Sequence, residues 1–233
     1  MDTKLALGLG AAVIGIVLIM ALFMMGPSSN NEGVGGQSGG AASTIDLTSY
    51  WVSASPSSPL LHLQFSRALS GATVITLTDS SGNTVCVQSY EQSPGNTVVL
   101  SNIVPPNLMG TYTLNVEEGG KTVLKKTLNF PTPTLNLVNY DVDEYGTDTS
   151  KTVVFLNLTI HESGKSPFYY NTLGWEIEGE HHEEYVSTKY LAQNTDTLVS
   201  IPLSKELSTG EHTITVHFIY NGEELNIAVN FTV

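Results

Sequence analysis

The side chains best suited to chemistry gather in one acidic segment, residues 175–184. It reads Trp-Glu-Ile-Glu-Gly-Glu-His-His-Glu-Glu, so five glutamates accompany two adjacent histidines, His181 and His182. Carboxylate and imidazole groups are ligands that zinc accepts in proteins. The segment is therefore a candidate site for a cation or a cationic partner, with His181 and His182 as candidate metal ligands.

The expected geometry of this segment favours a simpler interpretation. If the segment is one continuous strand, Glu176, Glu178 and Glu180 share one face. Trp175 and Ile177 then lie on the opposite face. Adjacent histidines on a strand also point to opposite faces, and nothing in the segment fixes a third ligand. We therefore expect a solvated acidic face over a buried tryptophan, with a cation site as the alternative.

A second acidic cluster contains Asp141, Asp143 and Glu144. Its spacing suggests a calcium loop, and these three residues are further candidate metal ligands. The cluster departs from the EF-hand pattern, because Tyr145 stands at the fifth position and Thr152 at the twelfth. The preferred interpretation is an ordinary acidic loop.

Enzyme motifs are absent from the sequence. It has no G-x-S-x-G elbow, no H-E-x-x-H pair and no phosphate-binding glycine loop. The glutamate cluster contains enough carboxylates for glycoside hydrolysis, but glutamates on a strand face need no such role. His62, His161 and His217 lie in strand-like stretches and are interpreted as structural or surface histidines. We expect a non-enzymatic protein without a cofactor.

Two N-glycosylation sequons begin at Asn157 and Asn230. They matter only if these residues lie outside the cytoplasm, and such triplets also arise by chance in chains rich in Asn and Thr. Asn157 and Asn230 are therefore candidate modification sites in an extracellular domain.

The elements that position these residues are short β-strands. From residue 44 onward, alternating segments are separated by turn signals, which is typical of a sandwich or barrel. In residues 111–116, Tyr112, Leu114 and Val116 point to one face. Pro131 and Pro133 end the first unit, since proline cannot continue a ladder. The expected strands of the first half are residues 45–52, 60–66, 72–78, 84–89, 96–101, 111–117 and 121–129.

The second half repeats this plan. Three landmarks recur in the same order, about 90–102 residues apart, as tandem copies of one fold would place them. The second copy carries extra residues between its early strands. The paired landmarks are residues 44–50 and 134–140, residues 110–116 and 210–216, and the turns at 119–120 and 221–222.

Seven strands in about 90–100 residues fit an immunoglobulin-like sandwich. Gly110-x-Tyr112-x-Leu114 resembles the tyrosine corner of that fold, and His212 takes the tyrosine's place in the second copy. We therefore expect a mainly β chain with two tandem Ig-like antiparallel sandwiches, residues 44–133 and 134–233.

The second half also resembles the cell-adhesion-related CARDB domains. The resemblance rests on the strand 151–160, the turn at 162–167 and the segment 207–216, and it spans residues 134–233. The resemblance implies surface display and adhesion or spacing, without catalysis.

An apolar run, residues 5–25, precedes these domains without a single charged side chain. At 1.5 Å per residue its 21 residues span about 31 Å, the thickness of a hydrocarbon core. We expect an uncleaved signal anchor, a single transmembrane helix after the short cytoplasmic segment 1–4. Lys4 precedes the run and no Lys or Arg follows until Arg67, so the remaining chain is expected outside the membrane. The Gly/Ser/Asn-rich residues 26–43 read as a flexible linker.

Composition narrows the range of partners. Charged residues make up only 13% of the chain, which suits an exported all-β protein. The net charge of −13 argues against nucleic acid as a partner. Residues 134–233 carry most of that charge, with 4 basic and 15 acidic side chains. The single cysteine, Cys86, rules out an internal disulfide and is expected in the core.

These features predict a cell-surface protein of the membrane, archaeal in composition. Its two sandwiches would serve adhesion, or assembly with a protein partner in the envelope or in a complex. One alternative is a pilin-like filament subunit, although Lys4-Leu5 lacks the usual Lys/Arg-Gly or -Ala junction. A second is an accessory subunit of a larger membrane complex. A third is a module that binds glycan or calcium.

Overall fold

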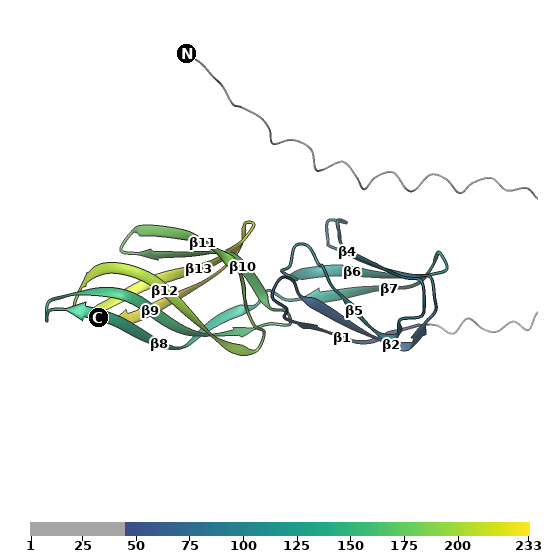
Figure 1. Ribbon diagram of the computed structural model, residues 1–233, viewed down its shortest axis with the longest axis horizontal. Helices are drawn as coiled ribbons and strands as arrows, with labels where there is room; N and C mark the ends of the chain where they lie inside the picture. The colour runs from purple at the N-terminus through teal and green to yellow at the C-terminus, as the bar shows by residue number, and fades with distance from the viewer. Residues whose placement is uncertain (1–44) are drawn as a thin grey trace, which may run out of the picture. The chain divides into compact units, whose positions relative to one another are not determined.

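The computed structural model describes residues 45–233, which form strands joined by turns and loops (Figure 1). The expected transmembrane segment 5–25 and linker 26–43 lie outside the described residues. Within residues 45–233 there is no helix with the length and apolarity needed to cross a membrane.

The strands of the first half are β1 (Leu47–Ser53), β2 (Leu60–Leu69), β3 (Thr73–Thr78), β4 (Thr84–Tyr90), β5 (Gly95–Leu100), β6 (Gly110–Glu118) and β7 (Lys121–Phe130). The strands of the second half are β8 (Thr134–Gly146), β9 (Ser150–Ser163), β10 (Phe168–Ile177), β11 (Glu180–Leu191), β12 (Thr195–Ser208), β13 (Glu211–Tyr220) and β14 (Glu223–Thr232). All seven strands expected in the first half are confirmed, with ends that differ by a few residues.

The first half is a sandwich of two antiparallel sheets, ordered β1-β2-β5 and β4-β3-β6-β7. Strand β6 shows why the sheets pack face to face. Tyr112, Leu114 and Val116 are buried, whereas Thr113 and Asn115 between them are half-buried on the other face, as the alternation predicts. The inward rows of both sheets meet in one apolar core, which also encloses Cys86 as expected.

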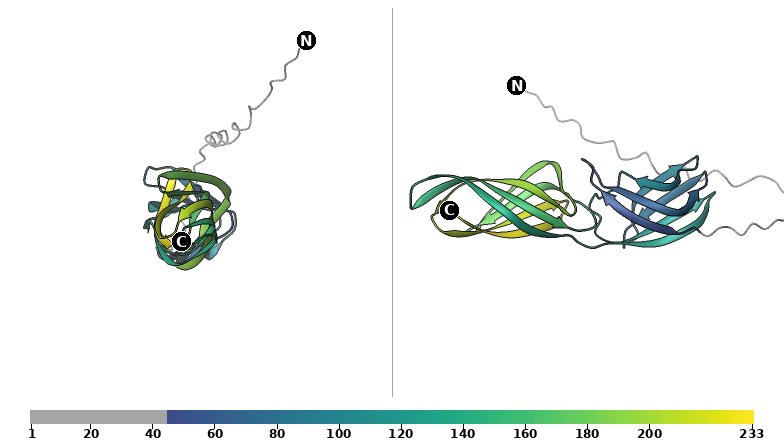
Figure 2. Two further views of the ribbon diagram at one scale, coloured as in Figure 1. Left: turned by 90° about the vertical axis from the view of Figure 1, so that its left-hand side faces the viewer. Right: turned by 90° about the horizontal axis from the view of Figure 1, so that it is seen from below.

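The second half has the same arrangement, strand for strand. Its strands form two sheets, ordered β12-β9-β8 and β11-β10-β13-β14 (Figures 1 and 2). These sheets enclose a second apolar core. Strands 1, 2 and 5 of each half form one sheet, and strands 3, 4, 6 and 7 form the other. The predicted pattern of mainly β structure with two antiparallel sandwiches is confirmed, and the matching order supports tandem copies.

The extra residues of the second copy lengthen its strands. Strands β8 and β9 have 13 and 14 residues, against 7 and 10 in β1 and β2. Residues 141–144, expected as an acidic loop, are part of β8. That expectation was wrong because Asp141 and Asp143 alternate on the exposed side of a long edge strand, and a shift in register between Asp143 and Glu144 lets the strand continue through the adjacent acidic residue.

The corner before β6 is fixed by a tyrosine, as its motif predicts. The Tyr112 hydroxyl donates to the Asn107 carbonyl oxygen at 3.4 Å and accepts from the Met109 N–H at 3.2 Å. In the second sandwich His212 makes the equivalent contact, with its Nε2 2.8 Å from the Ser208 carbonyl oxygen. Each ring therefore ties the start of its strand to the loop that precedes it.

Asn107 also joins the loop before β6 to the second half of the chain. Its side-chain amide donates to the Tyr169 carbonyl oxygen at 3.0 Å and accepts from the Tyr169 N–H at 2.6 Å. The Tyr169 hydroxyl donates to the Ser55 carbonyl oxygen at 2.8 Å. Asn107 and Tyr169 are almost fully buried, so both pairs of polar groups are satisfied away from water.

One carboxyl group is buried at the end of the second core. Glu162 follows the inward row of β9 and is fully buried, and neither of its carboxylate oxygens has a hydrogen-bond partner among residues 45–233. Burial raises the pKa of Glu162 to about 7, and the nearby Asn194 N–H and His161 lower it only in part. The folded state therefore favours the protonated acid.

Truncating the core of the second sandwich is expected to destabilise it strongly. Leu158 on β9 is fully buried in the core, so Leu158→Ala should cost about 2–5 kcal/mol of unfolding free energy. Leu198 on β12 is 70% exposed, so Leu198→Ala should change the unfolding free energy by less than about 0.5 kcal/mol. Urea unfolding of the full chain in mild detergent, followed by Trp175 fluorescence in a Trp51→Phe background, checks both values. Equal losses for the two variants would contradict the assigned core.

The stability of the second sandwich is expected to depend on pH through Glu162. Its pKa is raised from 4.5 when unfolded to about 7 when folded, so the stabilisation is complete below pH 4.5 and is lost as the pH rises to about 7. The loss should be on the order of 3 kcal/mol. Glu162→Gln removes this titration, so its unfolding free energy should rise relative to wild type between pH 4.5 and pH 7. A constant difference between the two proteins across this range would refute the assignment.

Candidate functional site

The acidic segment 175–184 forms a hairpin. Strand β10 ends at Ile177, and Glu178 and Gly179 turn the chain with φ angles of 51° and 80° before β11 begins at Glu180. Two successive positive φ angles are typical of a tight hairpin turn. The expectation that Glu176, Glu178 and Glu180 share one face of a single strand was therefore wrong.

The hairpin separates the glutamates into different environments. Glu178 and Glu180 approach Lys205 of β12, with N–O distances of 3.8 and 2.8 Å. Glu178 Oε1 also lies 3.2 Å from His212 Nδ1. Glu176 instead lies opposite His181 on the outer face of the β11-β10-β13-β14 sheet. Trp175 and Ile177 are buried as predicted.

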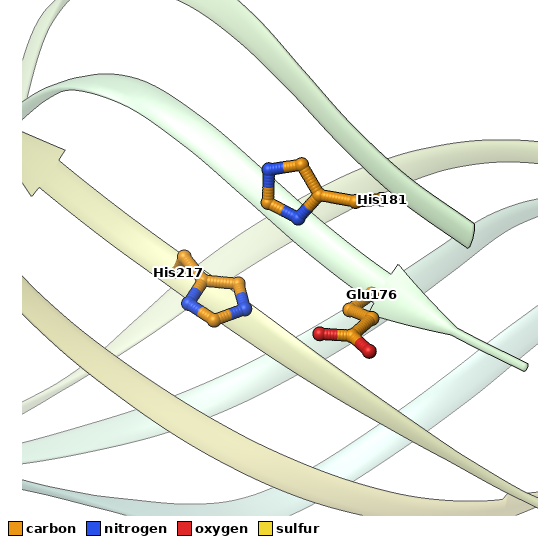
Figure 3. A group of neighbouring side chains, drawn as sticks. All are labelled: Glu176, His181 and His217. Carbon is orange, nitrogen blue, oxygen red and sulfur yellow. The ribbon is translucent and has the colours of Figure 1, made fainter. Parts of the chain in front are cut away.

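Strand pairing brings a third side chain to Glu176 and His181. On the other side of β10, strand β13 pairs with it so that His217 lies opposite Gly174, one row away from Glu176 on the same face. Figure 3 shows the three side chains converging beside one another from β10, β11 and β13. One ligand atom from each of Glu176, His181 and His217 lies within 4.8 Å of the others.

Each histidine of this cluster contacts its own carboxylate. His217 Nδ1 lies 2.5 Å from Glu224 Oε1, and this contact lowers the pKa of Glu224. His217 Nε2 is buried and has no hydrogen-bond partner within the described part of the chain. His181 Nε2 lies 3.0 Å from Glu183 Oε1. The two outer carboxylates thus orient the two imidazole rings toward the cluster.

Gly174 makes room for this arrangement. A Cβ atom at this position would come within 3.3 Å of Glu183 Cγ and His217 Cβ, and within 3.4 Å of the His182 carbonyl oxygen. A larger side chain in the middle strand would push β11 and β13 side chains apart. The glycine therefore lets the flanking side chains lean over β10.

The remaining candidate ligands lie elsewhere. His182 is on the other face of β11, and its ring stacks on Trp175 with centroids 5.1 Å apart. Asp141, Asp143 and Glu144 belong to β8 in the opposite sheet, and Glu144 pairs with Lys151. Of the five candidates, the structure places only His181 in the three-residue cluster of the described chain.

His217 and Glu176 complete a group that the sequence did not reveal. His217 stands 36 positions beyond His181 and was interpreted as structural, because no local spacing links the two. Only the register of β10 with both β11 and β13 unites them. The sole signal in the sequence was a histidine at an alternating position of an expected strand.

The two sequon asparagines lie on outward faces in the second sandwich. Asn157 in the middle strand β9 is half-buried, and its Oδ1 accepts a hydrogen bond from the Ser200 hydroxyl at 2.6 Å. Asn230 on the edge strand β14 is exposed, and its Oδ1 accepts from the Thr213 hydroxyl at 2.8 Å. Asn230 is thus the more accessible of the two.

A groove of about 540 Å³ lies beside strand β1. Tyr50 and Trp51 contribute aromatic groups to it, and the ring of Trp51 stacks on His62 with centroids 4.8 Å apart. Gln193 and Asn194 add amide groups to its lining. Among its described lining residues there is no group of histidine and acidic side chains like the cluster on β10, β11 and β13.

No protein-family model matches the chain, and no curated protein matches it. The CARDB resemblance therefore stays a prediction. Among solved structures, the chain is similar to one described as "Biofilm associated protein - BSP domain", with 12% sequence identity and a TM-score of 0.27. The match covers 81% of this chain and 30% of the other, so the chain spans less than a third of that protein's length.

Proposed function

We propose that this protein displays two immunoglobulin-like sandwiches beyond a membrane and acts through protein contacts without catalysis. The observation that carries the proposal is the repeated strand order. In each half, a sheet of strands 1, 2 and 5 faces a sheet of strands 4, 3, 6 and 7. This arrangement fits an Ig-like sandwich whose fourth strand belongs to the sheet of strands 3, 6 and 7. Tandem rigid units of this kind suit spacing and adhesion.

The proposed attachment to the membrane rests on the amino-acid sequence. In this proposal the apolar residues 5–25 span a hydrocarbon core, and the Gly/Ser/Asn-rich residues 26–43 act as a tether with an average end-to-end distance of roughly 25 Å. The scarcity of Lys and Arg after Lys4 supports an outward orientation of everything beyond the anchor. The sandwiches would then sit on the cell surface, free to meet a partner.

The exposed surfaces indicate how such a partner would be held. Edge strands such as β11 and β14 present unpaired backbone groups, to which an extended partner segment can add. The second sandwich carries 15 acidic and 4 basic side chains, so a basic or metal-bearing partner surface complements it. We infer that the second sandwich is the recognition unit and that the first places it farther from the anchor.

Protease treatment of intact cells tests this proposal. The full-length chain should fractionate with membranes, and external protease should cut within residues 26–43 and release a fragment containing both sandwiches. Permeabilised cells serve as the control for total cleavable protein. Intact mass and N-terminal sequence of the membrane-bound and sheared material complete the measurement.

Other outcomes would replace the proposal. Full protection in intact cells, with cleavage only after permeabilisation, would place the sandwiches inside. A chain that starts near Leu5 in sheared material would identify a pilin-like filament subunit. Stable co-purification with other membrane proteins in mild detergent would identify an accessory subunit.

A further inference from the structure

We propose that Glu176, His181 and His217 bind one zinc ion on the outer face of the β11-β10-β13-β14 sheet. Two imidazoles with one carboxylate are a ligand set that zinc uses in proteins. Three hydrogen-bonded neighbouring strands supply one ligand each, with the ligand atoms within 4.8 Å of one another. The inference goes beyond the display function, which requires no ion.

His217 is the anchor of the proposed site. Its Nδ1 lies 2.5 Å from Glu224, and a proton on Nδ1 leaves a lone pair on Nε2. That Nε2 is buried and lacks a hydrogen-bond partner in the two sandwiches that the structure describes, a situation that folded proteins generally avoid. A zinc ion bound to Nε2 would satisfy the atom, and Glu224 would be the carboxylate that commonly orients a metal-binding histidine.

His181 repeats the arrangement from the neighbouring strand. Its Nε2 lies 3.0 Å from Glu183, so a proton on Nε2 leaves a lone pair on Nδ1. Figure 3 shows a ring nitrogen of each histidine turned toward the space beside the Glu176 carboxylate. Both rings thus present a free nitrogen to the same place, each held from behind by a carboxylate.

Small rotations would complete the coordination. With bonds of about 2.0–2.2 Å, a tetrahedral zinc ion brings its ligand atoms to about 3.3 Å from one another. Glu176 and His181 are exposed, so their side chains can rotate inward. His217 is held by its contact with Glu224. The ion would therefore meet one fixed ligand and two adjustable ones.

The ligand set favours zinc over calcium or magnesium. These hard cations prefer oxygen ligands and higher coordination numbers, whereas imidazole suits zinc. Glu183 and Glu224 add negative charge around the ion without direct ligation. Three protein ligands leave a fourth position open to water or to a side chain of a protein partner.

Zinc titration of the full-length protein tests the proposal. The chain, without a polyhistidine tag, is purified in mild detergent, stripped with a chelator, and titrated with zinc against a chromophoric competitor. We expect one zinc per chain, with affinity lowered roughly tenfold or more in His217→Ala and in His181→Ala. Glu224→Gln, which keeps all three ligands, should also weaken zinc binding roughly tenfold.

His161→Ala is the matched control. His161 also pairs with a carboxylate, at 2.7 Å from Asp196, but it lies on the other sheet of the same sandwich. The zinc affinity of His161→Ala should equal that of wild type. Zinc should raise the melting temperature of wild type and of His161→Ala, but not that of the His181→Ala/His217→Ala double variant. Urea unfolding without zinc shows that each variant is folded.

Two results would overturn the proposal. The first is wild-type zinc binding no stronger than that of the folded double variant. The second is equal loss of affinity in His161→Ala and His217→Ala, which would indicate diffuse binding to the acidic surface. As a check on the choice of metal, calcium at the same concentration should change the melting temperatures of wild type and the double variant by the same amount.

Discussion

Each sandwich depends on burying one face of every sheet against the other sheet. In the second half, the inward rows of β9 and β12 meet those of β10, β13 and β14, and the aliphatic and aromatic side chains between them are almost fully enclosed. Apolar burial of this kind is the dominant favourable term in folding. Because each strand alternates, the same packing fixes which residues face solvent, and so it fixes the outer surface where His217 and Glu176 meet.

Much of the fold could be predicted from the sequence because its signals are local. Alternation in residues 111–116 and glycine turns such as Gly119-Gly120 mark strands and hairpins without reference to the rest of the chain. The tyrosine corner at Tyr112 was also readable, because its partners lie within five residues. Repeated landmarks then extended the prediction from one half to the other.

The candidate site was harder to predict because it depends on register. Glu178 and Gly179 reverse the chain within a run that otherwise reads as a continuous strand, so the face shared by the glutamates could not be assigned correctly. The approach of His217 depends on which strand lies beside β10 and on its alignment with Gly174. Neither fact has a local signal, since strand order follows from packing of the whole sandwich.

Because the Glu162 carboxyl is buried, folding of the second sandwich is coupled to the uptake of a proton. Between pH 4.5 and about 7 the unfolded chain carries this group ionised, whereas the folded sandwich holds it protonated. Folding in that range therefore takes a proton from the buffer, and unfolding returns it. The heat of unfolding measured by calorimetry should then vary with the ionisation enthalpy of the buffer, because the buffer absorbs the proton that the protein releases.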